Sequence, residues 1–166
     1  MERYIARHRD ELGDRAAALS DAEKAGVAAY FSGAELARVR VVVGDPLPVA
    51  DVPFAGVIRR LGFDFPSVGL TAAITFDDLI ASREPMEPSL LFHELVHVVQ
   101  YRLLGVNEFA RLYVRGFLEE RQYGSIPLER CAFELERRFV MEGRAFSVER
   151  EVAAWIERGS TFIAKG

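Results

Sequence analysis

The stretch Leu90-Leu91-Phe92-His93-Glu94-Leu95-Val96-His97-Val98-Val99-Gln100 contains two of the chain's three histidines within a mostly apolar run. On an α-helix, residues four positions apart lie about 40° apart around the axis and one turn apart along it. His93 and His97 are therefore expected to present their imidazoles side by side, at a spacing that one metal ion can bridge. Glu94 lies about 100° around the axis from His93, so its carboxylate can reach a water on that metal without being a ligand. The pattern predicts two zinc ligands and a general base on one helix.

An alternative interpretation is that His93 and His97 are hydrogen-bonded residues of an ordinary core helix. Burying the neighbouring Glu94 without a metal or another partner would be costly, because a carboxylate loses its hydration in an apolar environment. The metal site is therefore the favoured interpretation of this stretch.

The length of 166 residues predicts one domain over 1–166, large enough to bury a core. The net charge of −4 and the pI near 5.5 argue against a nucleic-acid partner or an anionic membrane surface. No apolar run approaches the roughly 20 residues that a membrane span requires. The single cysteine and the highly charged first residues predict a cytoplasmic protein without a signal peptide.

Hydrophobic periodicity, helix caps and breaks at glycine and proline predict an α+β fold, mostly helical, with a small β-sheet beside the helix that carries the histidines. Asp77-Asp78 is expected to form a turn, and residues 160–166 a frayed tail. Helices are expected at 2–19, 21–31, 53–61, 88–104, 108–122, 128–141 and 147–158, and strands at 38–43, 70–76 and 79–81.

A catalytic zinc site usually has a third protein ligand, and no histidine follows His97. Glu129 is the preferred candidate, because Ala132 on the same helical face would allow a close approach to the histidine helix. Glu134 is the alternative, either as the ligand or as an acceptor that orients one imidazole. Cys131 is expected to be a buried small residue, and Glu136 to form ion pairs with arginines on its own helix.

Three further side chains have both a functional and a structural interpretation. His8 could bind a metal, but among exposed charges a solvated surface histidine is favoured. Tyr113 or Tyr123 could donate a hydroxyl to an oxyanion, but a core aromatic is favoured for each. None of the three is included in the predicted site.

The segment from His93 to Gln100, followed by Tyr123, Ile126-Pro127-Leu128-Glu129 and Ala132, resembles the small zincin-type metallopeptidase-like domains of the gluzincin kind, including bacterial proteins with an HELxHxxQ core. The resemblance covers about residues 70–142, preceded by helices and a strand in 1–69. It implies a zincin-like minimal fold with a zinc site, in which His93, His97 and Glu129 match the zinc ligands and Glu94 the catalytic base. The Asn-Glu-x-x-Ser-Asp form of the glutamate helix is absent.

These observations together predict a zinc-dependent hydrolase, a metallopeptidase-like protein whose substrate is a peptide or protein. The alternative is a non-catalytic protein that keeps zinc for folding or for binding a partner. A di-iron helical bundle would need a second Glu-x-x-His motif, which the sequence lacks.

Overall fold

The computed structural model describes residues 1–44, 47, 72–120 and 123–163, without the side chains of 117, 123 and 160–163. The predicted helix at 53–61 and the first residues of the predicted strand at 70–76 lie outside this part of the chain. The elements are α1 (Glu2–Gly13), β1 (Ala17–Ala18), α2 (Asp21–Val27), α3 (Gly33–Arg38), β2 (Arg40–Val43), β3 (Ala73–Phe76), β4 (Leu79–Ser82), α5 (Pro88–Glu120), the 3₁₀ turn η2 (Tyr123–Ser125), α6 (Pro127–Glu142) and α7 (Val148–Ile163).

A four-stranded mixed sheet has the strand order β1-β2-β4-β3. β2 and β4 are parallel, with Val41 opposite Ile80, while the outer strands β1 and β3 pair antiparallel with their neighbours. β3 and β4 form a hairpin whose turn contains Asp77 at a φ of 61°. Helices make up 67% of the described residues, and together with the small sheet they confirm the predicted α+β class.

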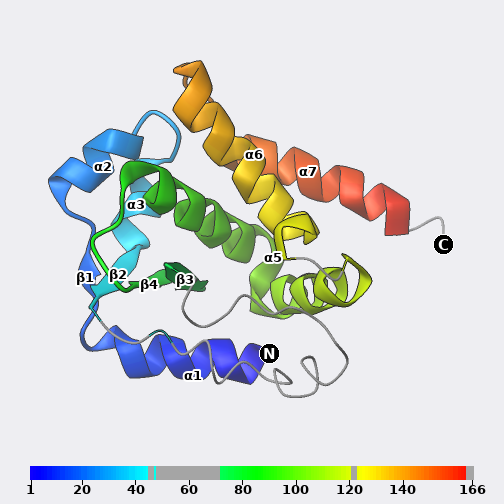
Figure 1. Cartoon of the computed structure of the whole chain (residues 1–166), viewed down its shortest axis with the longest axis horizontal. Helices are drawn as coiled ribbons and strands as arrows, with labels where there is room; N and C mark the ends of the chain where they lie inside the picture. Colours follow the sequence, from blue (N-terminus) through cyan, green and yellow to red (C-terminus); the bar gives the residue numbers. More distant parts are fainter. Residues whose placement is uncertain (45–46, 48–71, 121–122, 164–166) are drawn as a thin grey trace.

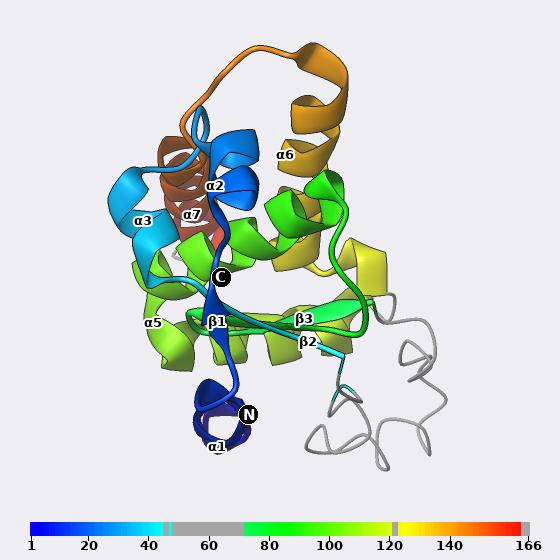
Figure 2. The ribbon, with the colours of Figure 1, turned by 90° about the vertical axis from the view of Figure 1, so that its left-hand side faces the viewer.

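The sheet lies between two helical layers (Figure 2). α1 packs on one side and α5 on the other, and α6 and α7 lie beyond α5 (Figures 1 and 2). One group of buried residues, including Phe92, Val96 and Leu135, joins α5 to α6 and α7 and also to α2, α3 and the sheet. A second, including Ile5, Phe76 and Leu128, joins α1 to the sheet and to the start of α6. Among the described residues, no helix combines the length and apolar character needed to cross a membrane.

The N-terminal third differs from the prediction in where its helices end. α1 stops at Gly13 instead of Leu19, and Ala17–Ala18 pair with β2 as a short edge strand. Ser20 caps α2 through a capping box with Glu23, in agreement with the predicted start at residue 21. Ser32 does not end that helix, however; it forms a second capping box and begins α3. This second cap was not predicted.

α5 begins at Pro88 and is interrupted at Gly105, whose φ of 75° and ψ of 156° are not helical. Glycine accepts a positive φ at little cost because it has no Cβ. The break confirms the prediction of two helices separated at this residue. α6 begins with Pro127 in its first turn, as expected, and is followed by Gly143 in the left-handed conformation.

Serine 147 caps α7, since its hydroxyl accepts a hydrogen bond from the backbone N–H of Arg150. The predicted end at residue 158 is wrong, because α7 continues to Ile163. The expectation of a frayed tail is therefore incorrect for residues 160–163.

Candidate metal centre

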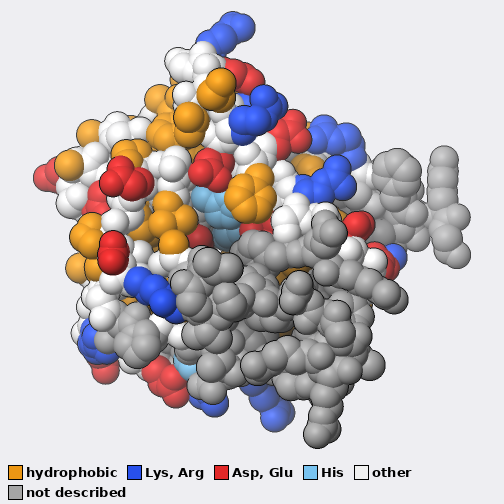
Figure 3. All heavy atoms as spheres, in the orientation of Figure 1, with side chains coloured by type: hydrophobic (Ala, Val, Ile, Leu, Met, Phe, Trp, Pro, Cys, Tyr) orange, Lys and Arg blue, Asp and Glu red, His pale blue; other side chains and the backbone are white. Residues whose placement is uncertain are grey.

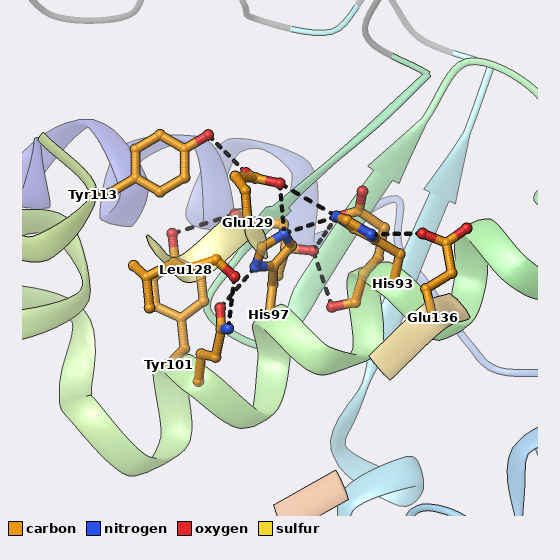
Figure 4. Close-up of polar contacts among 10 residues, drawn as sticks. His93, His97, Tyr101, Tyr113, Leu128, Glu129 and Glu136 are labelled. Atoms are coloured by element: carbon orange, nitrogen blue, oxygen red, sulfur yellow. Dashed lines mark hydrogen bonds and ion pairs between the residues drawn. The ribbon is translucent and has the colours of Figure 1, made fainter. Parts of the chain in front are cut away.

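Two elements bring the predicted ligands together. His93 and His97 lie one turn apart on the first half of α5, and Glu129 lies in the first turn of α6. Figure 4 shows the three side chains pointing toward one another, with Oε2 of the glutamate facing both imidazoles. Ala132 is completely buried on α6, which fits the predicted close packing of this helix against α5.

The three facing atoms have the spacing of ligands on a single ion. The Nε2 atoms of His93 and His97 are 3.2 Å apart. Oε2 of Glu129 lies 3.3 Å from Nε2 of His93 and 3.5 Å from Nε2 of His97. Nitrogen and oxygen ligands at tetrahedral corners, with metal–ligand distances of about 2.0–2.1 Å, lie about 3.3–3.4 Å from one another. The buried group of His93, His97 and Glu129 can therefore hold a metal ion.

The other ring nitrogen of each histidine is bound to an acceptor. The Gln100 amide nitrogen donates to the carbonyl of Leu128 at 3.0 Å, so the amide oxygen is the atom that faces Nδ1 of His97 at 2.8 Å. Nδ1 of His93 lies 3.0 Å from a carboxylate oxygen of Glu136. Each Nδ1 is therefore the protonated nitrogen, and a neutral ring presents the lone pair of its Nε2 to the centre.

Two lone pairs and a carboxylate oxygen that converge within 3.5 Å repel one another unless a cation lies among them. Without a metal, the cation is a proton. Burial alone lowers the pKa of His97, but the Glu129 carboxylate outweighs this effect and raises the pKa to about 9. Burial likewise raises the pKa of Glu129, but the two imidazoles outweigh it and hold that pKa far below its usual range. The arrangement is one that a proton or a metal ion stabilises.

A tyrosine from the second half of α5 holds the remaining oxygen of Glu129. The Tyr113 hydroxyl donates a hydrogen bond of 2.8 Å to Oε1, which leaves Oε2 directed at the histidines (Figure 4). Tyr113 was expected to be a core aromatic and Glu136 to pair with arginines on its own helix. The expectation for Glu136 is wrong, because its carboxylate contacts His93. Tyr113 packs against the core as expected, with its ring stacked on that of Phe109, and its hydroxyl in addition contacts Glu129.

The contact between Tyr113 and Glu129 depends on a close approach of two helices. A Cβ built on Gly116 would lie 2.7 Å from Cδ of Pro127 and 3.2 Å from a methyl carbon of Ile126. Only glycine lets the second half of α5 lie this close to the start of α6. A small residue at 116, one turn after Tyr113, is the signal from which the sequence could have indicated this contact.

Glu94, the predicted base, is buried between α5 and the sheet, 5% exposed. The Thr75 hydroxyl on β3 donates a 2.6 Å hydrogen bond to one of its carboxylate oxygens. Burial raises the pKa of Glu94, while the positive charge that His97 and His93 carry when protonated and the Thr75 hydrogen bond act in the opposite direction. The carboxylate thus lies in the field of the metal-binding group, with one oxygen already bound by a hydroxyl.

The other candidates do not join the group. Glu134 is exposed on another face of α6, and Cys131 is buried as expected, with burial raising the pKa of its thiol to about 11. His8 is not a solvated histidine: it is 5% exposed, and its ring packs 4.5 Å from that of Tyr4. The side chain of Tyr123 lies outside the described residues.

The group lies beside the molecular surface. Figure 3 shows a histidine side chain at the bottom of a hollow, flanked by carboxylates and hydrophobic side chains. The ring of Phe133 packs against His93, with 4.6 Å between centroids, and is 44% exposed.

No family model, curated protein or solved structure matches this chain.

Proposed function

We propose that the protein is a zinc-dependent hydrolase of the metallopeptidase-like kind, with a peptide or protein as substrate. The observation that supports it is the convergence of two Nε2 atoms and one carboxylate oxygen at tetrahedral spacing, beside a second buried carboxylate. Zinc suits this donor set, because it accepts imidazole and carboxylate ligands in tetrahedral sites. The zincin-like resemblance of the motif agrees with this assignment. The single free cysteine, Cys131, supports a cytoplasmic location as part of the same proposal.

The residues around the centre have distinct tasks. Zinc bound by His93, His97 and Glu129 would lower the pKa of a coordinated water towards about 7. Glu94 would then be the group that accepts a proton from the attacking water and passes it to the leaving amine. Thr75 holds one oxygen of the Glu94 carboxylate, which leaves the other free to take the proton.

A second candidate function is a zinc-binding protein without catalysis. It is favoured by burial, since His93 and His97 are each 5% exposed and Glu129 is 1% exposed. Structural zinc sites are closed, whereas catalytic sites keep one position open to water. The two functions differ in the role of Glu94, which is required for hydrolysis in the first and has no catalytic role in the second.

The first test is the metal content of protein purified without chelators. We expect about one zinc per chain in the wild type and loss of the metal in Glu129→Gln. Glu134→Gln is the matched control, because it makes the same change at an exposed position of the same helix. Wild-type protein that takes up no zinc on reconstitution would contradict the proposal.

The second test separates catalysis from structure. In Glu94→Gln we expect zinc to be retained and hydrolysis of a peptide library to fall by at least about 10²-fold. The control is Glu87→Gln, an exposed glutamate just before α5. Zinc-loaded wild type without hydrolysis of any library member would favour the non-catalytic function, and undiminished hydrolysis by Glu94→Gln would remove the assigned base.

A further inference from the structure

A pocket separate from the metal-binding group lies between α6 and α7. Its volume is about 510 Å³, within the range of small-molecule sites. α6 contributes Arg130, Phe133 and Glu134 above Cys131, and α7 contributes Trp155 and Arg158. None of these residues belongs to the histidine–glutamate group, although Phe133 also contacts His93.

The pocket has an excess of positive charge in a chain whose net charge is −4. Arg130 and Arg158 form no salt bridge with a carboxylate among the residues that the structure describes. Glu134 is the acidic group of the lining. Both Glu134 and Arg158 line the pocket together with the buried Cys131.

The remaining lining is apolar and aromatic. Trp155 is half-buried and Phe133 is 44% exposed, so both rings offer surface to a ligand. Pro127 extends the apolar wall beside η2. Two guanidinium groups near aromatic rings suit a carboxylate attached to an apolar group, because the planar guanidinium binds carboxylates through paired hydrogen bonds and the rings cover the apolar part.

We propose that the pocket between α6 and α7 binds a carboxylate with an aromatic or aliphatic substituent, held by Arg130 and Arg158 and covered by Trp155 and Phe133. This chemistry occurs in free organic acids and at the C-terminus of a peptide. The proposal is independent of the proposed hydrolase function.

Trp155 supplies the measurement, because it is the only tryptophan in the chain. The protein as purified is titrated with 4-phenylbutyrate while the tryptophan fluorescence is recorded, and 4-phenylbutyramide serves as the uncharged control. We expect a saturable change with the acid alone. Arg130→Gln and Arg158→Gln should each weaken binding at least tenfold, whereas Arg137→Gln, an exposed α6 arginine outside the lining, should not change it.

Two further measurements show at which site the carboxylate binds and from which class of molecule it comes. Repeating the titration with a chelator separates this pocket from the metal-binding group, because a carboxylate bound to the metal would be lost with the metal. A short peptide that ends in phenylalanine is also titrated, with its C-terminal amide as the uncharged control. If the peptide with the free carboxylate binds more tightly than phenylbutyrate, the ligand is a peptide C-terminus. If that peptide binds more weakly, the ligand is a free organic acid. The proposal would be overturned by any of four results. These are equal responses to the acid and the amide, no fluorescence response at all, weakening of binding by Arg137→Gln equal to that by Arg130→Gln and Arg158→Gln, or loss of the response with the chelator.

Discussion

Tyr113 and Glu129 are joined by a 2.8 Å hydrogen bond that determines which oxygen of the glutamate faces the histidines. The Tyr113 hydroxyl donates to Oε1 of Glu129, and Oε2 lies 3.3 Å from Nε2 of His93. The two residues come from different helices, so the hydrogen bond also ties the second half of α5 to the start of α6. Removing it should change the metal site without removing any proposed ligand.

In Tyr113→Phe we expect zinc affinity to fall about 10- to 100-fold, because the glutamate loses the partner that orients it. Competition with a chromophoric chelator measures this effect. Tyr30→Phe removes a hydroxyl from a tyrosine that packs among phenylalanine rings away from the site, and it should bind zinc normally. Wild-type affinity in Tyr113→Phe would show that the hydrogen bond does not position Glu129.

Glu136→Gln should weaken zinc binding by at least about tenfold, since a neutral amide supports the His93 imidazole less well than a carboxylate does. The same chelator competition applies. Glu142→Gln is the matched control, because Glu142 lies on the same helix and approaches Arg138 at 3.7 Å. An equal loss in both variants would point to the overall charge of the helix instead of the contact with His93.

Gly116→Ala should lower the free energy of unfolding by about 1–2 kcal/mol, because the added methyl would lie 2.7 Å from the Pro127 ring. Urea denaturation measures the change. Gly26→Ala makes the same substitution in α2, where the methyl meets nothing within 4 Å. That variant should be unchanged or more stable by up to about 1 kcal/mol, from the higher helix propensity of alanine.

Zinc affinity should rise with pH by about tenfold per unit until about pH 9, because zinc must displace the proton of His97. The same raised pKa of His97 makes the stability of the metal-free protein fall as the pH rises. In metal-free protein the His97–Glu129 pair contributes stability fully below about pH 6.5, and the contribution is lost as the pH rises through about 9.

Chelator competition across this pH range tests the dependence. Glu129→Gln lacks the carboxylate that raises the pKa of His97. The remaining zinc affinity of this variant should therefore stop rising at a lower pH than that of the wild type. An affinity in the wild type that does not change between pH 6.5 and 9 would contradict a protonated His97 in the metal-free protein.

The sequence alone determined the local features of this protein. The four-residue spacing of His93 and His97 places both rings on one helical face, and Pro88 and Gly105 mark where that helix begins and breaks. These features depend on helical periodicity and on backbone conformations that proline and glycine favour, so neighbouring residues are enough to predict them.

The tertiary structure decided which distant side chains meet these histidines. Glu129 and Glu134 lie on the same helix, and only the packing of α6 on α5 directs the first toward the rings and leaves the second exposed. Packing likewise recruits Glu136 and Tyr113. Their contacts span 43 and 16 residues of sequence. Such contacts depend on how helices approach one another, which is decided by the shape of whole buried faces and not by any local pattern.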